Sequence, residues 1–255
     1  MHELSLVFFT FLAQTSVGIV VLSTLALLIG KMDRHQHEKA LYAAFAALAL
    51  GGVASLTHLG QPLKAINALS AIGQSPMSNE IIATIMFGGL LLATLVCLKV
   101  KQGNNTVKSV SLFSTFAGVV LVHTIPTIYT IESVTAWNTM YTSIYMLLTP
   151  LIMGATVVFL ICGCRLFKYT ALISLLVGII LMPSYFAHIG LSTATLSGQD
   201  TLFWMLKLAF AGLAIISLSS KKKDNTQFAS LAVVFVAASE IAGRIGFFEL
   251  WQIGM

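Results

Sequence analysis

The sequence predicts an all-α, polytopic integral membrane protein: a bundle of eight transmembrane helices forming a single domain over residues 1–255. Three observations lead to this prediction. Hydrophobic residues make up 57% of the chain and charged residues only 9%, whereas a soluble domain carries about a quarter charged residues. The apolar residues gather in eight runs, each close to the roughly 20 residues that a helix needs to cross a bilayer. Basic residues concentrate in every second connection between the runs.

The eight predicted spans follow one another with short connections, at residues 4–30, 40–60, 79–99, 107–130, 142–163, 169–190, 200–220 and 227–250. The first span has no Lys or Arg ahead of it and is too long for a secretory signal, so we expect it to remain as a helix. Pro126 and Pro183 interrupt the fourth and sixth spans. Each proline removes one helical hydrogen bond, which produces either a packed kink or a stretch of backbone that lines a cavity.

The connection from Gln61 to Ser75 resembles a short interfacial helix. Leu63, Ile66 and Leu69 recur at a spacing of three residues, which gives an apolar stripe, and Gly73 can end the helix. Such a helix either roofs a pocket that is open to lipid or simply covers the helix ends.

The net charge of +5 at neutral pH is explained by topology. One set of loops or helix ends holds Lys31, Arg34, Lys39, Lys99, Lys101, Lys108, Arg165, Lys168, Lys221, Lys222 and Lys223. The opposite loops hold only Lys64. Because cytoplasmic loops are enriched in Lys and Arg, the first set is cytoplasmic and both termini are extracytoplasmic. No nucleic-acid partner is therefore expected.

The ionisable residues inside the spans fall mainly in the outer half of the bilayer under this topology. They are His58, Glu80, His123, His188, Lys207, Glu240 and Arg244. Ionisable groups at such depth are costly and are usually functional. A transporter should carry polar groups at the midplane, and a proton pump should carry a relay across the bilayer. The one-sided arrangement, with an apolar inner half, instead indicates a site that opens to the outer face.

His58 ends the second span and Glu80 opens the third, so both are expected at the outer boundary. A neutral imidazole can accept a proton from a hydroxyl group and release it to water. Two structural roles remain open: His58 can be bonded to a backbone carbonyl, and Glu80 can be a first-turn carboxylate that the helix dipole favours. Ser78 or Asn79 is the expected N-cap of that helix.

Three further groups of residues bear on whether the chain holds a ligand, a haem or a metal. Glu240 and Arg244 are four residues apart and form either a structural ion pair or a contact to a ligand oxygen or proton path. His123 and His188 would allow at most one b-type haem near the outer face, since His35 and His37 are placed in a cytoplasmic loop. The three cysteines, Cys97, Cys162 and Cys164, do not make an iron–sulfur or zinc site.

Several motifs together resemble the anchor subunit of bacterial dimethyl sulfoxide reductase. They are His2-Glu3 with Phe9-Thr10, Leu59-Gly60-x-Pro62 after His58, Asn67, Ile72-Gly73, Ser78-Asn79-Glu80-Ile81, Trp137, Thr149-Pro150, and Glu240-Ile241-x-Gly243-Arg244. The resemblance runs over most of the chain. The His-Leu-Gly-x-Pro and Ser-Asn-Glu-Ile elements are its specific part, whereas spans five to seven match mostly by hydropathy.

The resemblance implies a menaquinol-oxidising subunit of the bacterial inner membrane, with bound menaquinol or menaquinone and with neither haem nor iron–sulfur cluster of its own. It would anchor a ferredoxin-like iron–sulfur subunit and a molybdopterin catalytic subunit on the extracytoplasmic face. His58 and Glu80 take the catalytic roles in this assignment. Gln61, Pro62, Asn79 and Arg244 complete the expected quinol site, and Glu240, His123 and His188 are assigned to a proton path or to its support.

Three other functions are consistent with the residues. A b-type haem membrane anchor would use the histidines as ligands, and a small-molecule transporter would act without soluble subunits. A purely structural anchor would leave His58 and Glu80 without a role.

Overall fold

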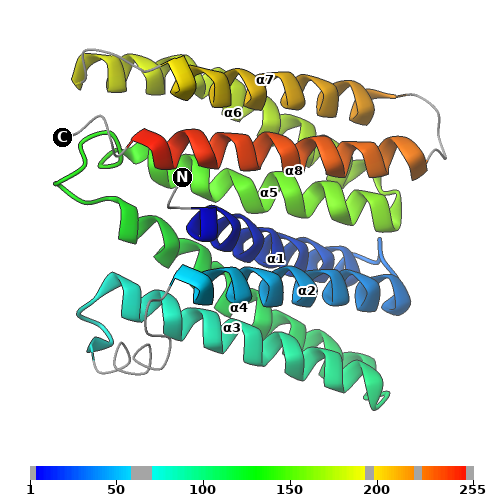
Figure 1. Ribbon diagram of the computed structural model, residues 1–255. Helices are drawn as coiled ribbons and strands as arrows, with labels where there is room; N and C mark the ends of the chain where they lie inside the picture. The colour runs from blue at the N-terminus through cyan, green and yellow to red at the C-terminus, as the bar shows by residue number, and fades with distance from the viewer. Residues whose placement is uncertain (1–3, 59–70, 193–197, 221–225, 251–255) are drawn as a thin grey trace.

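The computed structural model describes residues 4–58, 71–192, 198–220 and 226–250, and eight long helices account for nearly all of them (Figure 1). The helices are α1 (Leu4–Leu28), α2 (Arg34–His58), α3 (Pro76–Lys99), α4 (Asn104–Tyr129), α5 (Met140–Cys162), α6 (Arg165–Ser192), α7 (Gly198–Ser219) and α8 (Thr226–Glu249). All eight are long and apolar enough to cross a membrane. The prediction of an eight-helix, all-α membrane protein is confirmed.

The helices run back and forth along one direction, so that alternate connections lie at the same end of the bundle. The beginnings of α1, α3, α5 and α7 and the ends of α2, α4, α6 and α8 lie at one end (Figure 1). We call this the α3-start end. It is the end that the basic-residue pattern assigns to the outer face of the membrane, an assignment that stays a prediction.

The largest difference from the predicted spans is the start of α2, which begins at Arg34 rather than near residue 40. The N–H of Gln36 donates to Asp33 Oδ1 at 2.8 Å, and Gln36 Oε1 accepts from the N–H of Asp33 at 3.1 Å. These reciprocal bonds form a capping box, which satisfies backbone donors at the helix start. The expectation that His35 and His37 lie in a loop is therefore wrong, because both belong to the first turns of α2.

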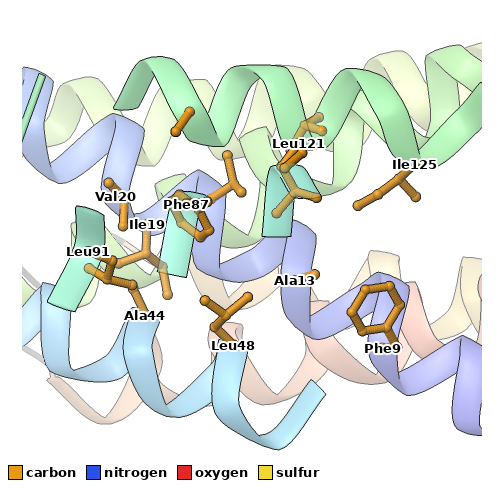
Figure 2. Close-up of a cluster of buried hydrophobic side chains, with 14 of the residues drawn as sticks. Phe9, Ala13, Ile19, Val20, Ala44, Leu48, Phe87, Leu91, Leu121 and Ile125 are labelled. Carbon is orange, nitrogen blue, oxygen red and sulfur yellow. The ribbon is translucent and has the colours of Figure 1, made fainter. Parts of the chain in front are cut away.

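α1 lies at the centre of the bundle and packs against α2, α4, α5 and α8. One hydrophobic core lies mainly between α1, α2, α3 and α4, as Figure 2 shows around Phe87 and Leu121. A second core joins α1 to α5, α6, α7 and α8. The bundle therefore has two halves that share α1.

α1 and α5 approach so closely that only glycine fits at their crossing. A Cβ atom on Gly18 would lie 2.0 Å from the carbonyl oxygen of Pro150, and one on Gly154 would lie 2.3 Å from the carbonyl carbon of Gly18. Small residues at helix contacts allow this backbone-to-backbone packing in membrane proteins. The contact fixes α5, which carries Thr149, against α1, which carries Gln14.

The outward faces of the bundle are strongly apolar, as expected for surfaces in contact with lipid. Phe116, Ile180 and Ile216 each expose more than two thirds of their surface. Toward the end of the bundle opposite the α3-start end, the interior is less apolar than the sequence suggests. His37 is fully buried there, with Nε2 3.1 Å from Ser111 Oγ, and Thr94 lies 2.9 Å from Ser114 through their hydroxyls. The expectation of an apolar inner half is corrected accordingly.

Candidate functional site

The start of α3 differs from the expected capping. The helix begins at Pro76, and Ser75 is the N-cap, in an extended conformation. Ser78 and Asn79 thus lie inside the helix and neither is the N-cap. Asn79 Oδ1 instead accepts a hydrogen bond of 2.7 Å from the N–H of Gly73, whose positive φ of 79° favours glycine. The Asn79 side chain ties the preceding turn to the helix.

Glu80 lies beyond the first turn of α3, because the helix starts four residues before it. The interpretation as a first-turn carboxylate held by the helix dipole does not fit this position, since that effect falls off within the first turn. The residue is only 9% exposed, and its Oε1 atom has no hydrogen-bond partner among the described residues. An ionised carboxylate is costly to bury without partners, so this oxygen is available to a proton or to a polar ligand.

His58 is the last residue of α2, so its backbone lies at the α3-start end. Figure 1 shows the end of α2 and the beginning of α3 at the same end of the bundle, and the two helices pack against each other. The His58 side chain, Gln61 and Pro62 lie outside the part of the chain that the structure describes. A direct pairing of His58 with Glu80 therefore stays a prediction.

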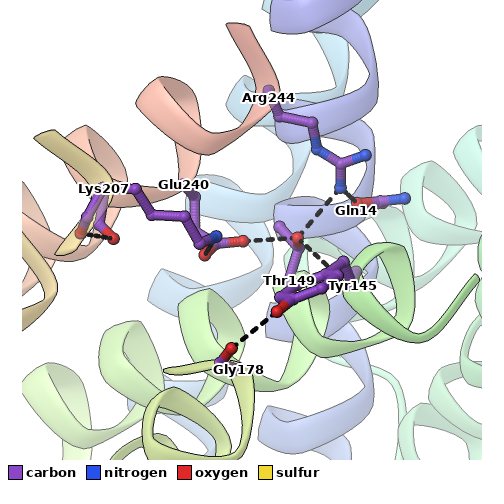
Figure 3. A network of polar contacts seen from close by, with 8 residues as sticks. Gln14, Tyr145, Thr149, Gly178, Lys207, Glu240 and Arg244 are labelled. Atoms are coloured by element: carbon purple, nitrogen blue, oxygen red, sulfur yellow. Dashed lines mark hydrogen bonds and ion pairs between the residues drawn. The ribbon is translucent and has the colours of Figure 1, made fainter. Parts of the chain in front are cut away.

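A second group of polar residues lies inside the half of the bundle formed by α1 with α5, α6, α7 and α8 (Figure 3). Lys207 Nζ of α7 is 3.2 Å from Glu240 Oε1, and Thr149 Oγ1 of α5 donates to Glu240 Oε2 at 2.6 Å. Arg244 Nη2 donates to Thr149 Oγ1 at 3.0 Å and also to Gln14 Oε1 of α1. We call these five residues the α8 polar cluster. It ties together four helices: α1, α5, α7 and α8.

The ion pair in the α8 polar cluster differs from the expected pairing of Glu240 with Arg244. Glu240 pairs with Lys207 from the neighbouring helix, and Thr149 bridges Glu240 to Arg244. Gly243 leaves room for this arrangement, because a Cβ atom there would lie 2.7 Å from Lys207 Nζ and would displace the end of that side chain. The sequence indicated that Lys207, Glu240 and Arg244 are embedded, but it assigned no role to Gln14 or to the Thr149 hydroxyl.

The cluster is held further by contacts of Lys207. Its ammonium lies 5.5 Å from the centre of the Tyr145 ring, in a cation–π arrangement. Ser239 Oγ donates to the Lys207 carbonyl at 2.8 Å, and the Tyr145 hydroxyl donates to the Gly178 carbonyl at 2.9 Å. These bonds fix Lys207 relative to α5, α6 and α8.

The structure does not bring all of the predicted quinol-site residues together. Arg244 lies on α8, which packs against α1, α5 and α7, whereas Glu80 and Asn79 lie on α3, which packs against α2 and α4. Arg244 therefore belongs to the α8 polar cluster and not to the neighbourhood of Glu80. Glu240, assigned to a proton path or its support, is in that same cluster.

The two histidines of the haem alternative are both exposed and lie on different helices. A groove of about 370 Å³ lies between α1, α4 and α5, and His123 of α4 is the one ionisable side chain among its described lining residues, the rest of which are apolar. His188 of α6 lies with its ring 6.2 Å from that of Tyr141. Among the described residues, no group of three or more His, Cys, Asp or Glu is placed to hold a metal ion.

Comparisons with known proteins agree with the resemblance read from the motifs. The family described as DMSO reductase anchor subunit (DmsC) matches residues 1–192. The sequence is 30% identical over 277 aligned residues to the anaerobic dimethyl sulfoxide reductase subunit YnfH of Escherichia coli, covering 100% of this protein and 97% of the relative. It is 36% identical over 163 residues to the C subunit of the anaerobic dimethyl sulfoxide reductase of Haemophilus influenzae, covering 61% of this protein and 57% of the relative. The corresponding C subunit of Escherichia coli is 31% identical over 163 residues, covering 60% of this protein and 55% of the relative.

Proposed function

The chain belongs to the family of DMSO reductase anchor subunits, and on this premise we propose that it oxidises menaquinol in the bacterial inner membrane for a reductase complex. It holds a ferredoxin-like iron–sulfur subunit and a molybdopterin catalytic subunit at the α3-start end, which faces the extracytoplasmic side. The observation that carries the proposal is Glu80, a buried carboxylate with an oxygen that no described residue binds.

Quinol oxidation requires groups that accept protons and a route for electrons. Each menaquinol that becomes menaquinone releases two protons and two electrons. His58 and Glu80 lie on adjacent helix ends and supply two proton acceptors at one end of the bundle. The quinol enters laterally from the lipid, the His58 imidazole accepts a hydrogen bond from one hydroxyl, and Glu80 passes protons outward. The two electrons go to the nearest cluster of the iron–sulfur subunit.

Proton release and electron transfer then occur on the same side of the membrane. This half-reaction alone does not build a membrane potential, because no charge crosses the bilayer. The α8 polar cluster is not needed for this route, since it lies in the other half of the bundle.

The connection between α4 and α5 offers the partner subunits an ordered surface at the α3-start end. Trp137 in this connection donates from Nε1 to the carbonyl of Phe247 at 2.8 Å, and its ring stacks on that of Phe247 at 5.3 Å. Tyr129 packs edge-on against both rings. The segment around Trp137 is therefore fixed to the bundle. The proposed docking surface combines residues 132–141 with residues 61–77, of which 61–70 lie outside the part of the chain that the structure describes.

The proposal is tested on the complex purified through a tag on this chain from its native host. We expect both partner subunits and menaquinone to co-purify. In the complex, Glu80→Gln should lower menaquinol-dependent turnover by about a hundredfold or more, the typical effect of removing a proton-transfer group. Turnover with a reduced viologen dye, which delivers electrons directly to the soluble subunits, should stay unchanged.

Glu38→Gln, on the opposite end of the bundle, is the matched control and should leave both activities unchanged. Full menaquinol-dependent turnover in Glu80→Gln would remove Glu80 from the proton route. An equal loss of both activities would show that Glu80 acts in assembly only. His58→Ala is tested in the same way, by measuring its turnover with menaquinol and with the viologen dye.

A further inference from the structure

The α8 polar cluster carries one more positive than negative charge in a buried position. Lys207 and Arg244 are cations and Glu240 is the one carboxylate, with side-chain exposures of 12% for Lys207 and 5% each for Arg244 and Glu240. Arg244 also donates hydrogen bonds to the neutral side chains of Gln14 and Thr149. Because a buried charge without a counter-charge is strongly unfavourable, the cluster favours an added anion.

A small cavity adjoins these charges. Lys207, Glu240 and Arg244 form its polar wall, and Tyr185, Trp204 and Phe247 form much of the aromatic wall. Its volume is about 30 Å³, and a water molecule needs about 10–15 Å³ measured in this way. The cavity therefore has room for one or two particles of water size.

The Trp204 side chain supplies an unused hydrogen-bond donor in this wall. Trp204 is 5% exposed, and its Nε1 atom has no partner among the residues that the structure describes. A Cβ atom on Gly246 would lie 3.0 Å from that nitrogen, so the glycine makes room for the indole beside α8. A buried N–H that lacks an acceptor is unfavourable, and a bound anion would supply the acceptor.

We propose that this cavity binds a single chloride-sized anion between the Trp204 indole, the Lys207 ammonium and the Arg244 guanidinium. The anion neutralises the excess charge of the cluster and accepts the hydrogen bond from Trp204. The cavity lies toward the α3-start end, because its lining includes Thr142, near the beginning of α5, and reaches Thr149, about two turns deeper. The inference does not depend on the proposed quinol chemistry.

The test uses bromide, which quenches tryptophan fluorescence, with the full chain in lipid nanodiscs and gluconate as the non-binding counter-ion. We expect a saturable quenching component in the unaltered chain that chloride, a much weaker quencher, removes by competition. Trp204→Phe should abolish this component. Lys207→Met should weaken bromide binding by at least about 30-fold, because it removes a buried charge that contacts the anion.

Glu240→Gln makes the test specific for charge, since it leaves both cations and removes the carboxylate. It should tighten bromide binding by about tenfold or more, whereas a merely structural role would predict weaker binding in both variants. Lys168→Met, at the opposite end of the bundle, is the control and should have no effect. Linear quenching in the unaltered chain that chloride does not compete would overturn the proposal and assign the cavity to water, whether or not the variants fold.

Discussion

Thr149→Val tests whether the bridging hydroxyl holds the α8 polar cluster together. Valine has nearly the same shape as threonine, so the change removes one hydroxyl and leaves the packing of α5 in place. That hydroxyl donates to Glu240 at 2.6 Å and accepts from Arg244 at 3.0 Å. Hydrogen bonds between membrane helices average about 0.6 kcal/mol and reach about 1.7 kcal/mol. Two bonds to buried, charged partners should therefore contribute about 1–3 kcal/mol to the free energy of unfolding.

The measurement is unfolding of the purified chain in mixed micelles by a denaturing detergent, followed by circular dichroism. Thr149→Ser keeps the hydroxyl and should recover most of the loss. Thr127→Val is the matched control, because Thr127 is exposed on α4 and, within the described part of the chain, its hydroxyl bonds only to the carbonyl of Thr124 in its own helix. If Thr149→Val and Thr127→Val unfold at the same detergent concentration, the bridge contributes nothing and the reasoning is refuted.

Three other predictions concern the packing, the capping and the docking surface. Gly18→Ala should destabilise the chain by about 3 kcal/mol or more, at or above the usual range for overpacking, because the added Cβ would lie 2.0 Å from the carbonyl oxygen of Pro150. The control is Gly52→Ala, whose added Cβ has no described atom within 4 Å. It should unfold like the unaltered chain in the same detergent assay. Asp33→Ala should weaken the start of α2 by about 1 kcal/mol, seen as faster hydrogen exchange at the Gln36 amide, whereas Asp33→Asn should retain protection. Trp137→Ala should lower the amount of partner subunits that co-purify with the chain. Trp137→Phe, which keeps ring stacking, should lower this amount less. If the partner subunits co-purify equally with both variants, the proposed docking surface is contradicted.

The helix number was predictable because hydropathy reports the property that decides it, namely the transfer of about 20 residues into hydrocarbon. The ends of the helices depend on polar contacts that hydropathy does not report. The start of α2 is the clearest case, since the span was placed six residues too late. The Asp33-x-x-Gln36 capping box was present in the sequence and gives the correct position.

The polar contacts inside the bundle were only partly predictable. The spacing of Glu240 and Arg244 predicts an intrahelical pair, since residues four apart share a helix face. In the structure Glu240 instead forms its ion pair with Lys207 of α7. Gly243 of α8 has no side chain, which leaves room for the Lys207 ammonium beside α8. No pattern within one helix reports such a neighbour, so helix order in space had to be known first.

The same limit applies to the expected grouping of Arg244 with Glu80 in one site. Depth in the membrane, which the topology predicts, puts Arg244 and Glu80 in the same outer half. Position across the bundle, which the topology does not predict, puts them on opposite sides of α1. A residue such as Glu80, buried and with a carboxylate oxygen that no described residue binds, is suited to exchanging protons with a ligand. A residue such as Arg244, bound to two other helices, is suited to holding the bundle together and to offering fixed charge. The separation by α1 thus places the two groups in different halves of the bundle: the buried Glu80 carboxylate, our proposed proton acceptor, on α3, and the fixed charges of the α8 polar cluster beside α8.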